Sequence, residues 1–559
     1  MFIVRVGRCI GAAVRWAASP FVDRLGLTML LVAIQAVVPL MYFGGLLADG
    51  VTEWTSHWRA VPVTIHIRWV IAETMVYAWL AVLVYTICAR VRWLRRIWLT
   101  LVFTVTGLNW LWDALTMATY GQLMNIEIFH VLLASNLAEA KEFVGLHIGW
   151  STIAQIFGSI VAITVVWALA RGVERLAHRY GWLRAVIGVA GLLTVIYGVR
   201  VIDLSEPQYN GTWSMRGKWL QFIEREVMHT MEPQHPALVR VSTDTPRDIV
   251  LIIGESSTPL HSSLYGYRLE TNPRLAARLA AGELELFHEA RASELTTLTN
   301  IRQSLTAWRR GGGVPVHKSD NIIEIARLTG YRTAWLSNQS SKGFCDNPIH
   351  TLAQYCDTMV FTNDGHMSWH HGTFDGELLP IVKGVMAAGP DTTRLTIIHL
   401  MGSHFEYNQR FPADRTPFTA ADYPDRLPRL RQTLADYDNS LHYTDSVVDR
   451  IMELYRHRDA LVIYLSDHGE DIYVSSDDWV GHGRASLSTE SIRAGLRVPL
   501  IVYTTDSMRH AHPGLYESIR HAAKVPGART RFTMATLMHV MGVRFAHNDS
   551  TLNRSYFAR

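Results

Sequence analysis

The chain has 559 residues and a formal net charge of +4 at pH 7. That length exceeds a single domain, and so mild a positive charge does not favour nucleic-acid binding. Charged residues make up 18% of the chain, below the roughly 25% of typical soluble domains. This composition predicts a protein that is part membrane and part soluble.

Apolar segments of about 20 residues, nearly free of charge, recur through the first 202 residues. A helix of that length spans the roughly 30 Å hydrocarbon layer of a membrane, so the segments predict a transmembrane bundle of five helices. The first is too long for a cleavable signal peptide and lacks a small-residue cleavage site. The segments are Leu25–Ala48, Trp69–Ala89, Ile97–Met117, Ile148–Ala170 and Ala185–Ile202.

Arginine placement predicts the orientation of this bundle. Four arginines precede the first segment, four separate the second from the third, and four separate the fourth from the fifth. The other two loops carry only Arg59, Arg68 and Lys141. Because cytoplasmic loops are enriched in Lys and Arg, we expect a cytoplasmic N-terminus and an exported C-terminal part. No organelle signal is visible, which favours a bacterial inner membrane with the soluble part in the periplasm.

Two cysteines, Cys345 and Cys356, lie in the exported part. An oxidising compartment favours disulfide formation, so we expect them to close a small loop. The alternative is two free buried thiols.

The chain is predicted to have three parts: the transmembrane domain 1–202, a connector 203–246 and a periplasmic domain 247–559. In the connector, aromatic and aliphatic residues mix with arginine and lysine between Trp213 and Arg225. This pattern suits an amphipathic helix at the membrane interface. It equally suits an ordinary amphipathic helix packed on the soluble domain.

Short apolar runs alternate with helical patterns in the soluble part. Continuous rather than alternating apolarity is typical of strands buried on both faces, so the domain is predicted to be α/β with a largely parallel sheet. Such sheets bind ligands at the carboxyl ends of their strands. The runs are Ile249–Ile253, Thr333–Leu336, Leu395–Leu400, Ala460–Leu465 and Val498–Tyr503.

Carboxylates and imidazoles follow several of these runs. Glu255 follows the first, His404 the third, and Asp467 and His468 the fourth, while His482 stands in a later Gly-His-Gly. A single histidine after a strand is more often structural, but the combination is much more specific. Carboxylate oxygens and imidazole nitrogens suit zinc, so a zinc site is predicted at this edge of the sheet.

The order Gly-Glu-Ser at 254–256, "TNPRL" at 271–275 and Ser-Asp-His-Gly-Glu at 466–470 resembles the phosphoethanolamine transferases of Gram-negative bacteria. These belong to the alkaline phosphatase and sulfatase superfamily. The resemblance covers essentially the whole chain and implies five membrane helices with a periplasmic domain of alkaline phosphatase-like fold. The segments "SELTTLTNIRQSLT", "YRTAWLSNQ" and "HLMGSHFEYNQRFP" are most similar to the branch acting on the heptose of the lipopolysaccharide core.

The resemblance implies a threonine nucleophile at the start of a helix, about 40 residues after Glu255. Aligning this segment with the corresponding segment of the family favours Thr297 as the nucleophile, with Thr296 as the second candidate and Thr299 as the third. A threonine cluster also caps helices. The two roles are compatible, because a helix N-terminus offers N–H groups and a positive dipole end to a phosphate.

By the same resemblance, Glu255, Asp467 and His468 hold a zinc ion with Thr297 as the fourth ligand; a second zinc ion remains an alternative. Zinc lowers the pKa of a hydroxyl that it binds. Thr297 would then take phosphoethanolamine from phosphatidylethanolamine, with loss of diacylglycerol, and pass it to lipopolysaccharide, on core heptose or lipid A. This two-step transfer is a ping-pong mechanism. The protein is expected to be a monomer.

Further contacts follow from the family positions. His404 and His482 are expected to act as acid–base groups near the phosphate, for which the ordinary histidine pKa is suitable. Asn338 and Lys342 are expected to contact the transferred group, although Lys342 equally fits a solvated loop lysine.

A loop between the third and fourth segments carries the family's lipid-positioning motif as Ser135, Asn136 and Glu139; the alternative is a plain interfacial helix. Val131 stands where one branch has asparagine, which affects the expected substrate contacts. Ser293 stands where several relatives have a cysteine near the nucleophile. No zinc ligand is lost by either difference, although the acceptor can differ.

Three other functions compete with this prediction. A phosphoglycerol transferase of the same superfamily, acting on a periplasmic glycan, would use similar residues with manganese or magnesium, but the histidine-rich edge favours zinc. A sulfatase needs a Cys/Ser-x-Pro-x-Arg stretch, and none lies near residue 297. A non-catalytic assembly protein would lack ligands, whereas every expected ligand type is present.

Overall fold

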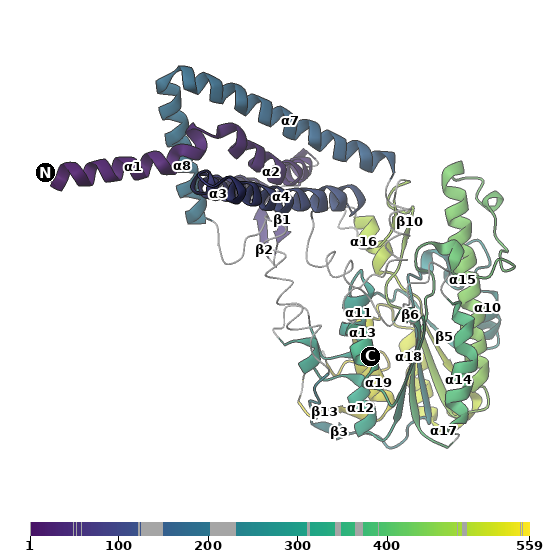
Figure 1. Ribbon diagram of the computed structural model, residues 1–559. Coiled ribbons are helices and arrows are strands. Elements are labelled where there is room, and N and C mark those ends of the chain that lie inside the picture. Colours follow the sequence, from purple (N-terminus) through teal and green to yellow (C-terminus); the bar gives the residue numbers. More distant parts are fainter. Residues whose placement is uncertain are drawn as a thin grey trace. The chain divides into compact units, whose positions relative to one another are not determined.

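The computed structural model describes most of the chain, and the described residues fall into two compact units. The first unit contains the long N-terminal helices, and the second contains a large sheet covered by helices (Figure 1). Described are residues 2–48, 50–51, 53–56, 59–120, 123, 149–201, 231–309, 314–340, 348–363, 373–389, 391–477, 479–482, 489–547, 549 and 552–558.

The first unit is built from long helices and one short hairpin. Four of the helices, α2, α3, α7 and α8, contain stretches long and apolar enough to cross a membrane. The helices are α1 (Phe2–Val22), α2 (Leu25–Ala48), α3 (Val63–Cys88), α4 (Arg92–Tyr120), α7 (Trp150–Arg179) and α8 (Gly181–Val201), and the hairpin pairs β1 (Glu53–Ser56) with β2 (Arg59–Pro62).

Each of the five predicted membrane segments overlaps a described helix, while Ile148 and Ile202, at the ends of the fourth and fifth, lie outside the described residues. The third, Ile97–Met117, lies within α4, which is not among the four apolar spans because polar groups such as Asn109 and Asp113 lower its hydropathy. Helix α1 was not predicted. The membrane-spanning N-terminal region is confirmed, whereas the number of crossings stays a prediction.

The second unit contains a seven-stranded sheet with spatial order β5-β12-β9-β4-β8-β6-β7. From β9 to β7 the strands are parallel, and β12 runs antiparallel to both β9 and β5. The strands are β4 (Asp248–Gly254), β5 (Leu284–Phe287), β6 (Arg332–Ser340), β7 (Thr358–Asn363), β8 (Arg394–His399), β9 (Ala460–Ser466) and β12 (Leu500–Thr504). The mostly parallel sheet is therefore confirmed.

The five predicted apolar runs correspond to the five inner strands of the sheet, whereas the two edge strands, β5 and β7, were not predicted. Strands β4, β8, β9 and β12 are buried along their whole length. Strand β5 is partly exposed, and no residue of β7 is fully buried. Because an edge strand faces solvent, it does not need the continuous apolar run that marks an inner strand.

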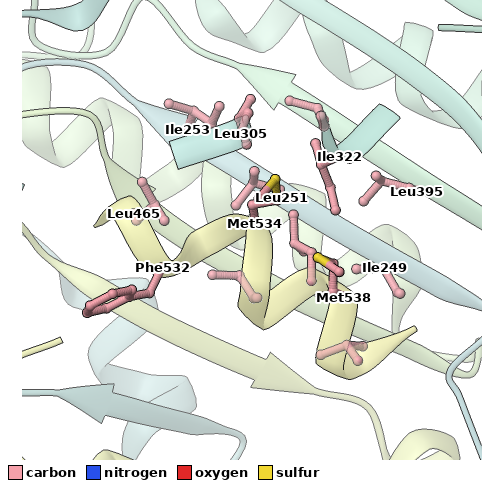
Figure 2. Close-up of a cluster of buried hydrophobic side chains, with 14 of the residues drawn as sticks. Ile249, Leu251, Ile253, Leu305, Ile322, Leu395, Leu465, Phe532, Met534 and Met538 are labelled. Atoms are coloured by element: carbon pink, nitrogen blue, oxygen red, sulfur yellow. The ribbon is translucent and has the colours of Figure 1, made fainter. Parts of the chain in front are cut away.

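Helices cover both faces of the sheet (Figure 1). Alternate residues of β4 point to opposite faces, so Ile249, Leu251 and Ile253 pack with Met534 and Met538 in one cluster (Figure 2). On the other face, Val250 and Ile252 pack against α14 and α15. Burying one such side chain contributes about 1.5–3 kcal/mol, which makes β4 the rigid centre of the domain.

Short helices and strands complete this unit. The helices are α10 (Pro273–Ala280), α11 (Thr297–Leu305), α12 (Ile322–Leu328), α13 (Pro348–Ala353), α14 (Leu378–Ala387), α15 (Pro428–Tyr455), α16 (Thr489–Leu496), α17 (Asp506–Ala511), α18 (Pro513–Ala523) and α19 (Thr533–Val540). Two small sheets pair β3 (Leu238–Arg240) with β13 (Val543–Phe545), and β10 (Asp471–Ile472) with β11 (Val480–Gly481).

The predicted disulfide between Cys345 and Cys356 stays a prediction, because Cys345 lies outside the described residues. Cys356 is a free, half-buried thiol packed against the hydrophobic cluster that contains Ile249. Burial raises the pKa of the Cys356 thiol to about 12, with a hydrogen bond to Thr333 opposing the change. Cys345 and the predicted connector helix at 213–225 lie outside the described residues.

Two glycines let the loops beyond β8 and β9 approach other backbone closely. Gly402 has φ 55°, and a Cβ there would lie 2.8 Å from the backbone nitrogen and oxygen of Glu255. A Cβ on Gly469 would lie 2.2 Å from the carbonyl oxygen of Arg497 and 2.5 Å from that of Ala494. Gly402 therefore packs against Glu255, and Gly469 follows His468 in the chain. Glu255 and His468 are both predicted metal ligands.

We expect Gly469→Ala to lower the free energy of unfolding by about 1–3 kcal/mol, because backbone must shift to make room. Gly384→Ala is the matched control: it lies in α14 with no heavy atom within 4 Å of the added Cβ, and it should raise stability by about 0.5–1 kcal/mol. Thermal unfolding of the full chain measures both. Equal midpoints for the two variants would contradict the close packing at Gly469.

Candidate metal site

Two neighbouring parallel strands, β4 and β9, bring the predicted ligands to the same end of the sheet. Gly254 at the end of β4 is paired with Ser466 at the end of β9. Glu255 and Asp467, the next residue of each chain segment, therefore emerge side by side. His468 follows, and all three side chains are buried.

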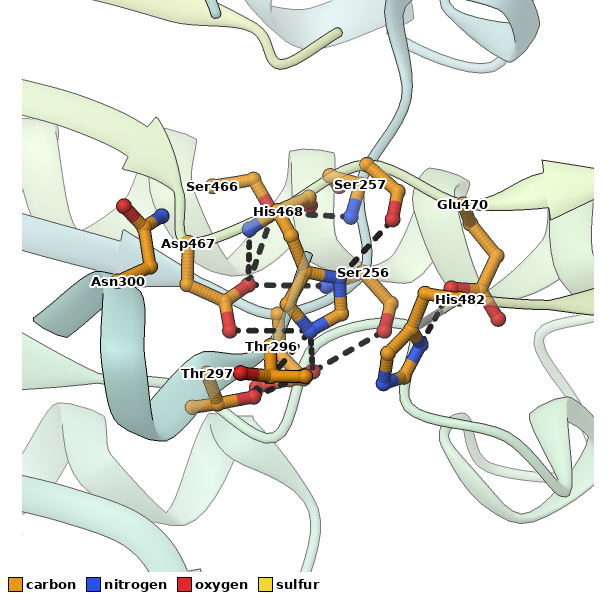
Figure 3. A network of polar contacts seen from close by, with 12 residues as sticks. Ser256, Ser257, Thr296, Thr297, Asn300, Ser466, Asp467, His468, Glu470 and His482 are labelled. Carbon is orange, nitrogen blue, oxygen red and sulfur yellow. Dashed lines mark hydrogen bonds and ion pairs between the residues drawn. The ribbon is translucent and has the colours of Figure 1, made fainter. Parts of the chain in front are cut away.

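Helix α11 brings a hydroxyl to these carboxylates. Thr297 is its first residue, and its Oγ1 donates to Glu255 Oε2 at 3.1 Å and lies 3.2 Å from His468 Nε2 (Figure 3). The Oγ1 of Thr296 donates instead to Thr299 Oγ1 at 3.3 Å. Of the three threonines considered from the sequence, Thr297 is therefore the one that contacts the carboxylate cluster.

The cluster concentrates negative charge around one imidazole. His468 Nε2 lies 3.1 Å from Glu255 Oε1 and 3.3 Å from Asp467 Oδ2. Burial lowers the pKa of His468, but the two carboxylates outweigh it and raise that pKa to about 10. Burial raises the pKa of Asp467, and the charge of Glu255 raises it further. Two carboxylates thus compete for a single positive charge.

The donor atoms fit a divalent metal ion. Glu255, Asp467 and His468 each offer one ligand atom, and these atoms lie within 4.8 Å of one another. Asp467 Oδ2 is buried yet accepts no hydrogen bond from the described part of the chain, which is costly unless a cation lies beside it. His468 Nδ1 donates to the Gly469 carbonyl oxygen at 2.9 Å, so Nε2 faces the carboxylates, as in many metal-binding histidines.

Ser256 supports both carboxylates from a strained backbone. Its φ of 56° lies in the left-handed region, where a non-glycine residue costs about 1–3 kcal/mol. In this conformation the Ser256 N–H donates to Asp467 Oδ1 at 3.3 Å, and its hydroxyl donates to Glu255 Oε1 at 3.0 Å. Ser256 therefore positions two of the predicted ligands, a role the sequence did not reveal.

A second group of possible ligands lies beside the first and contains His468, Glu470 and His482. The rings of His468 and His482 have centroids 3.9 Å apart. Glu470 lies 2.8 Å from His482 Nδ1 through Oε2, and accepts the hydroxyl of Tyr407 at 2.7 Å through Oε1. Glu470 was missed from the sequence, although it ends the Ser-Asp-His-Gly-Glu motif.

His404 lies half-buried in the loop after β8, with its ring stacked on Phe405 at 4.4 Å. Burial lowers the pKa of His404 to about 3, and the charge of Glu255 opposes that change. His404 is therefore a neutral imidazole at neutral pH. Neutral imidazole can bind a metal or accept a proton.

Asn338 makes four hydrogen bonds within the protein, and its predicted contact to the transferred group stays a prediction. Its Nδ2 donates to the Thr373 carbonyl at 2.8 Å and to Asp375 Oδ1 at 2.9 Å, and its Oδ1 accepts the hydroxyls of Thr362 and Thr373. These four bonds use its hydrogen-bonding capacity. Asp375 in turn accepts the N–H groups of Met401 and Gly402, so Asn338 helps to order the loop that carries His404.

Four other predicted contacts cannot be placed. Ser135, Asn136, Glu139 and Lys342 lie outside the described residues.

Residues 247–543, more than half of the chain, match the family model described as sulfatase. The chain belongs to the sulfatase family. Its sequence is 26% identical over 279 residues to the phosphoethanolamine transferase EptC of Escherichia coli O18:K1:H7 (strain RS218 / NMEC), covering 49% of this chain and 47% of that protein. The chain thus matches about half the length of this relative.

Two of the solved structures that resemble this sulfatase-family chain show its fold. The periplasmic domain of EptC from Escherichia coli, in complex with Zn, aligns with a TM-score of 0.51 at 23% identity, over 58% of this chain and 90% of that one. The integral membrane lipooligosaccharide phosphoethanolamine transferase A from Neisseria meningitidis aligns with a TM-score of 0.59 at 16% identity, over 92% and 95%. They confirm the predicted alkaline phosphatase-like fold with N-terminal membrane helices.

We expect Asp467→Asn to weaken metal binding at least about tenfold, as the loss of a ligand should cost no less than that of a supporting residue. Asp459→Asn is the matched control, because Asp459 precedes the same strand β9 at its other end and pairs with His512. Metal content of the purified full chain, measured by mass spectrometry after dialysis, reports both. Equal metal retention in the two variants would contradict the site.

Proposed function

We propose that the chain is an inner-membrane phosphoethanolamine transferase whose catalytic domain lies in the periplasm. It would move phosphoethanolamine from phosphatidylethanolamine to lipopolysaccharide, on core heptose or lipid A. The observation that carries the proposal is the placement of Thr297. A hydroxyl at the first position of α11 touches a buried carboxylate and an imidazole, which is the arrangement of an activated nucleophile.

The proposed metal is zinc, held by Glu255, Asp467, His468 and Thr297. Two carboxylates, an imidazole and a hydroxyl form a mixed oxygen and nitrogen donor set that zinc accepts, and the similar EptC domain was solved with zinc. Bound zinc would supply Lewis acidity, which lowers the pKa of the threonine hydroxyl. A second zinc ion beside His468, Glu470 and His482 remains an alternative.

In the first half-reaction, Thr297 Oγ1 forms a bond to the phosphorus of phosphatidylethanolamine, and the bond from phosphorus to the diacylglycerol oxygen breaks. The Thr297 proton has an acceptor at once, because that hydroxyl already donates to Glu255. The departing oxygen needs a proton in return. The backbone N–H groups that begin α11 would face the phosphate, because a helix N-terminus stabilises negative charge.

In the second half-reaction, an acceptor oxygen on lipopolysaccharide forms a bond to phosphorus and loses its proton. The bond from phosphorus to Thr297 Oγ1 breaks, and that oxygen recovers its proton from Glu255. His482 is suitable for two proton transfers: it can give a proton to the departing diacylglycerol oxygen and take one from the acceptor oxygen. Glu470 holds its Nδ1 at 2.8 Å, which leaves Nε2 to exchange the proton. Neutral His404 would contact the phosphate. The imidazoles at this edge favour zinc over the manganese or magnesium of a phosphoglycerol transferase.

We expect Thr297→Ala to lower transfer at least about 1,000-fold, because the nucleophile is removed. Thr296→Ala should retain activity within about tenfold, since the Thr296 side chain makes no cap hydrogen bond to α11. Transfer from labelled phosphatidylethanolamine to lipopolysaccharide by the full chain measures both variants. Trypsin digestion of the chain without substitutions should release a peptide, residues 292–302, that carries one phosphoethanolamine group.

Fragmentation of that peptide locates the group on Thr297, Thr296 or Thr299. A modified Thr296, or full activity of Thr297→Ala, would refute the nucleophile. Added phosphoglycerol in place of phosphoethanolamine would refute the donor.

A further inference from the structure

Arginines gather on three segments that lie side by side next to the candidate site. Arg291 pairs with Arg497 in an antiparallel bridge and with Arg529 in a parallel bridge. Residues directly opposite each other on paired segments place their side chains on the same face, with Cβ atoms about 4.5–5.5 Å apart. All three side chains are exposed. They begin a basic surface, which we call the arginine row.

Two more arginines extend the row. Arg531 lies two residues beyond Arg529, and the guanidinium carbons of Arg531 and Arg554 lie 5.0 and 4.9 Å from the centroid of the Phe532 ring. Cation–π contact with this buried ring holds both guanidinium groups in place. The arginine row therefore consists of Arg291, Arg497, Arg529, Arg531 and Arg554.

The row adjoins the candidate metal site at two points. Gly469, the residue after His468, packs so closely on the Arg497 carbonyl oxygen that no side chain fits between them. At the other point, the Arg531 N–H donates to Ser293 Oγ at 3.0 Å, and Thr530 donates to Asn300 Oδ1 at 2.7 Å.

Asn300 is one turn along α11 from Thr297, so these two side chains lie on neighbouring positions of one helix face. Asn300 is buried, and its Nδ2 donates to no acceptor among the described residues. A hydrogen-bond donor is thus left open between the nucleophile and the arginine row.

The positive charge of the row is not neutralised by any carboxylate among the residues that the structure describes. In the described part of the chain, none of the five arginines forms an ion pair with a carboxylate. Burial, Arg529 and Arg554 all lower the pKa of Arg531, which shows that like charges act on one another here. Like charges on directly opposite residues destabilise a sheet, so the row costs stability unless an anion binds it.

Guanidinium groups suit phosphate in particular. Each presents a planar fork of donors that matches two phosphate oxygens and keeps its charge at any physiological pH. We propose that the arginine row binds the phosphate groups of the acceptor glycolipid and so holds its receiving oxygen beside Thr297. The inference rests on the proposed function for the identity of this ligand.

The acceptor fits the row better than the donor does. Phosphatidylethanolamine carries one phosphate, and that group must lie at Thr297 to react. Five guanidinium groups beginning next to α11 instead match a ligand with further phosphates beyond the reacting position. A lipopolysaccharide with a phosphorylated lipid A or core has this chemistry.

The test is binding by the full chain in detergent, using purified lipopolysaccharide before and after removal of its phosphates with hydrogen fluoride. The unmodified chain should bind the phosphorylated form about tenfold more tightly, because several charged hydrogen bonds are involved. The triple variant Arg291→Gln, Arg497→Gln and Arg529→Gln should lose about this factor. It should bind the dephosphorylated form as the unmodified chain does.

A matched triple variant carries the same change of charge elsewhere. Arg240, Arg332 and Arg544 are exposed; two lie in the β3–β13 pair, and Arg332 begins β6 at the sheet edge opposite the site. Changing these three to Gln should leave binding unaltered. Equal losses in the two triple variants would overturn the inference, as would equal binding of the two lipopolysaccharide forms by the unmodified chain.

Vesicles containing phosphatidylglycerol separate acceptor recognition from attraction to any anionic membrane. If the arginine-row variant lost vesicle binding as strongly as lipopolysaccharide binding, the row would be a membrane contact and the inference would be wrong. Binding needs no chemical step. If the chain bound phosphorylated lipopolysaccharide more tightly but never released diacylglycerol from phosphatidylethanolamine, the inference about the arginine row would stand. The proposed function would then be wrong.

Discussion

The burial of three ionisable side chains at one point is the constraint on which the soluble unit depends. Glu255, Asp467 and His468 are each no more than 1% exposed, and their ligand atoms lie within 4.8 Å of one another. Taking such charges out of water costs several kcal/mol per ion unless they are paired. One imidazole cannot neutralise two carboxylates while also satisfying Asp467 Oδ2. A divalent cation can do so.

Much of the surrounding structure holds these groups in place. Parallel pairing of β4 with β9 sets Glu255 beside Asp467, and Gly469 permits the close approach that fixes His468. Ser256 accepts a strained backbone to donate to both carboxylates. Such supporting contacts keep a catalytic group within a few tenths of an ångström of its working position. The site is thus built on rigid strand ends rather than on free loops.

The sequence predicted the inner strands, and it proposed as metal ligands three residues that the structure brings together, because both leave local signals. Continuous apolar runs mark buried strands, and the Glu255 and Asp467 positions follow from where those runs stop. Edge strand β7, half-exposed, leaves no such run. The hydrogen bonds of Asn338 to Thr362, Thr373 and Asp375 could not be predicted, because these residues come close only in the folded domain. The pairing of Arg291 with Arg497 and Arg529 likewise could not be predicted, because these residues are far apart in the sequence.

X-ray absorption spectroscopy at the zinc edge, on the purified full chain, tests the central claim most directly. Zinc in the proposed site has only oxygen and nitrogen neighbours at about 2.0–2.2 Å, with one imidazole among them and no sulfur at about 2.3 Å. This account predicts that spectrum, together with its loss in Asp467→Asn. A folded chain without bound zinc, or a sulfur neighbour in the spectrum, would contradict it.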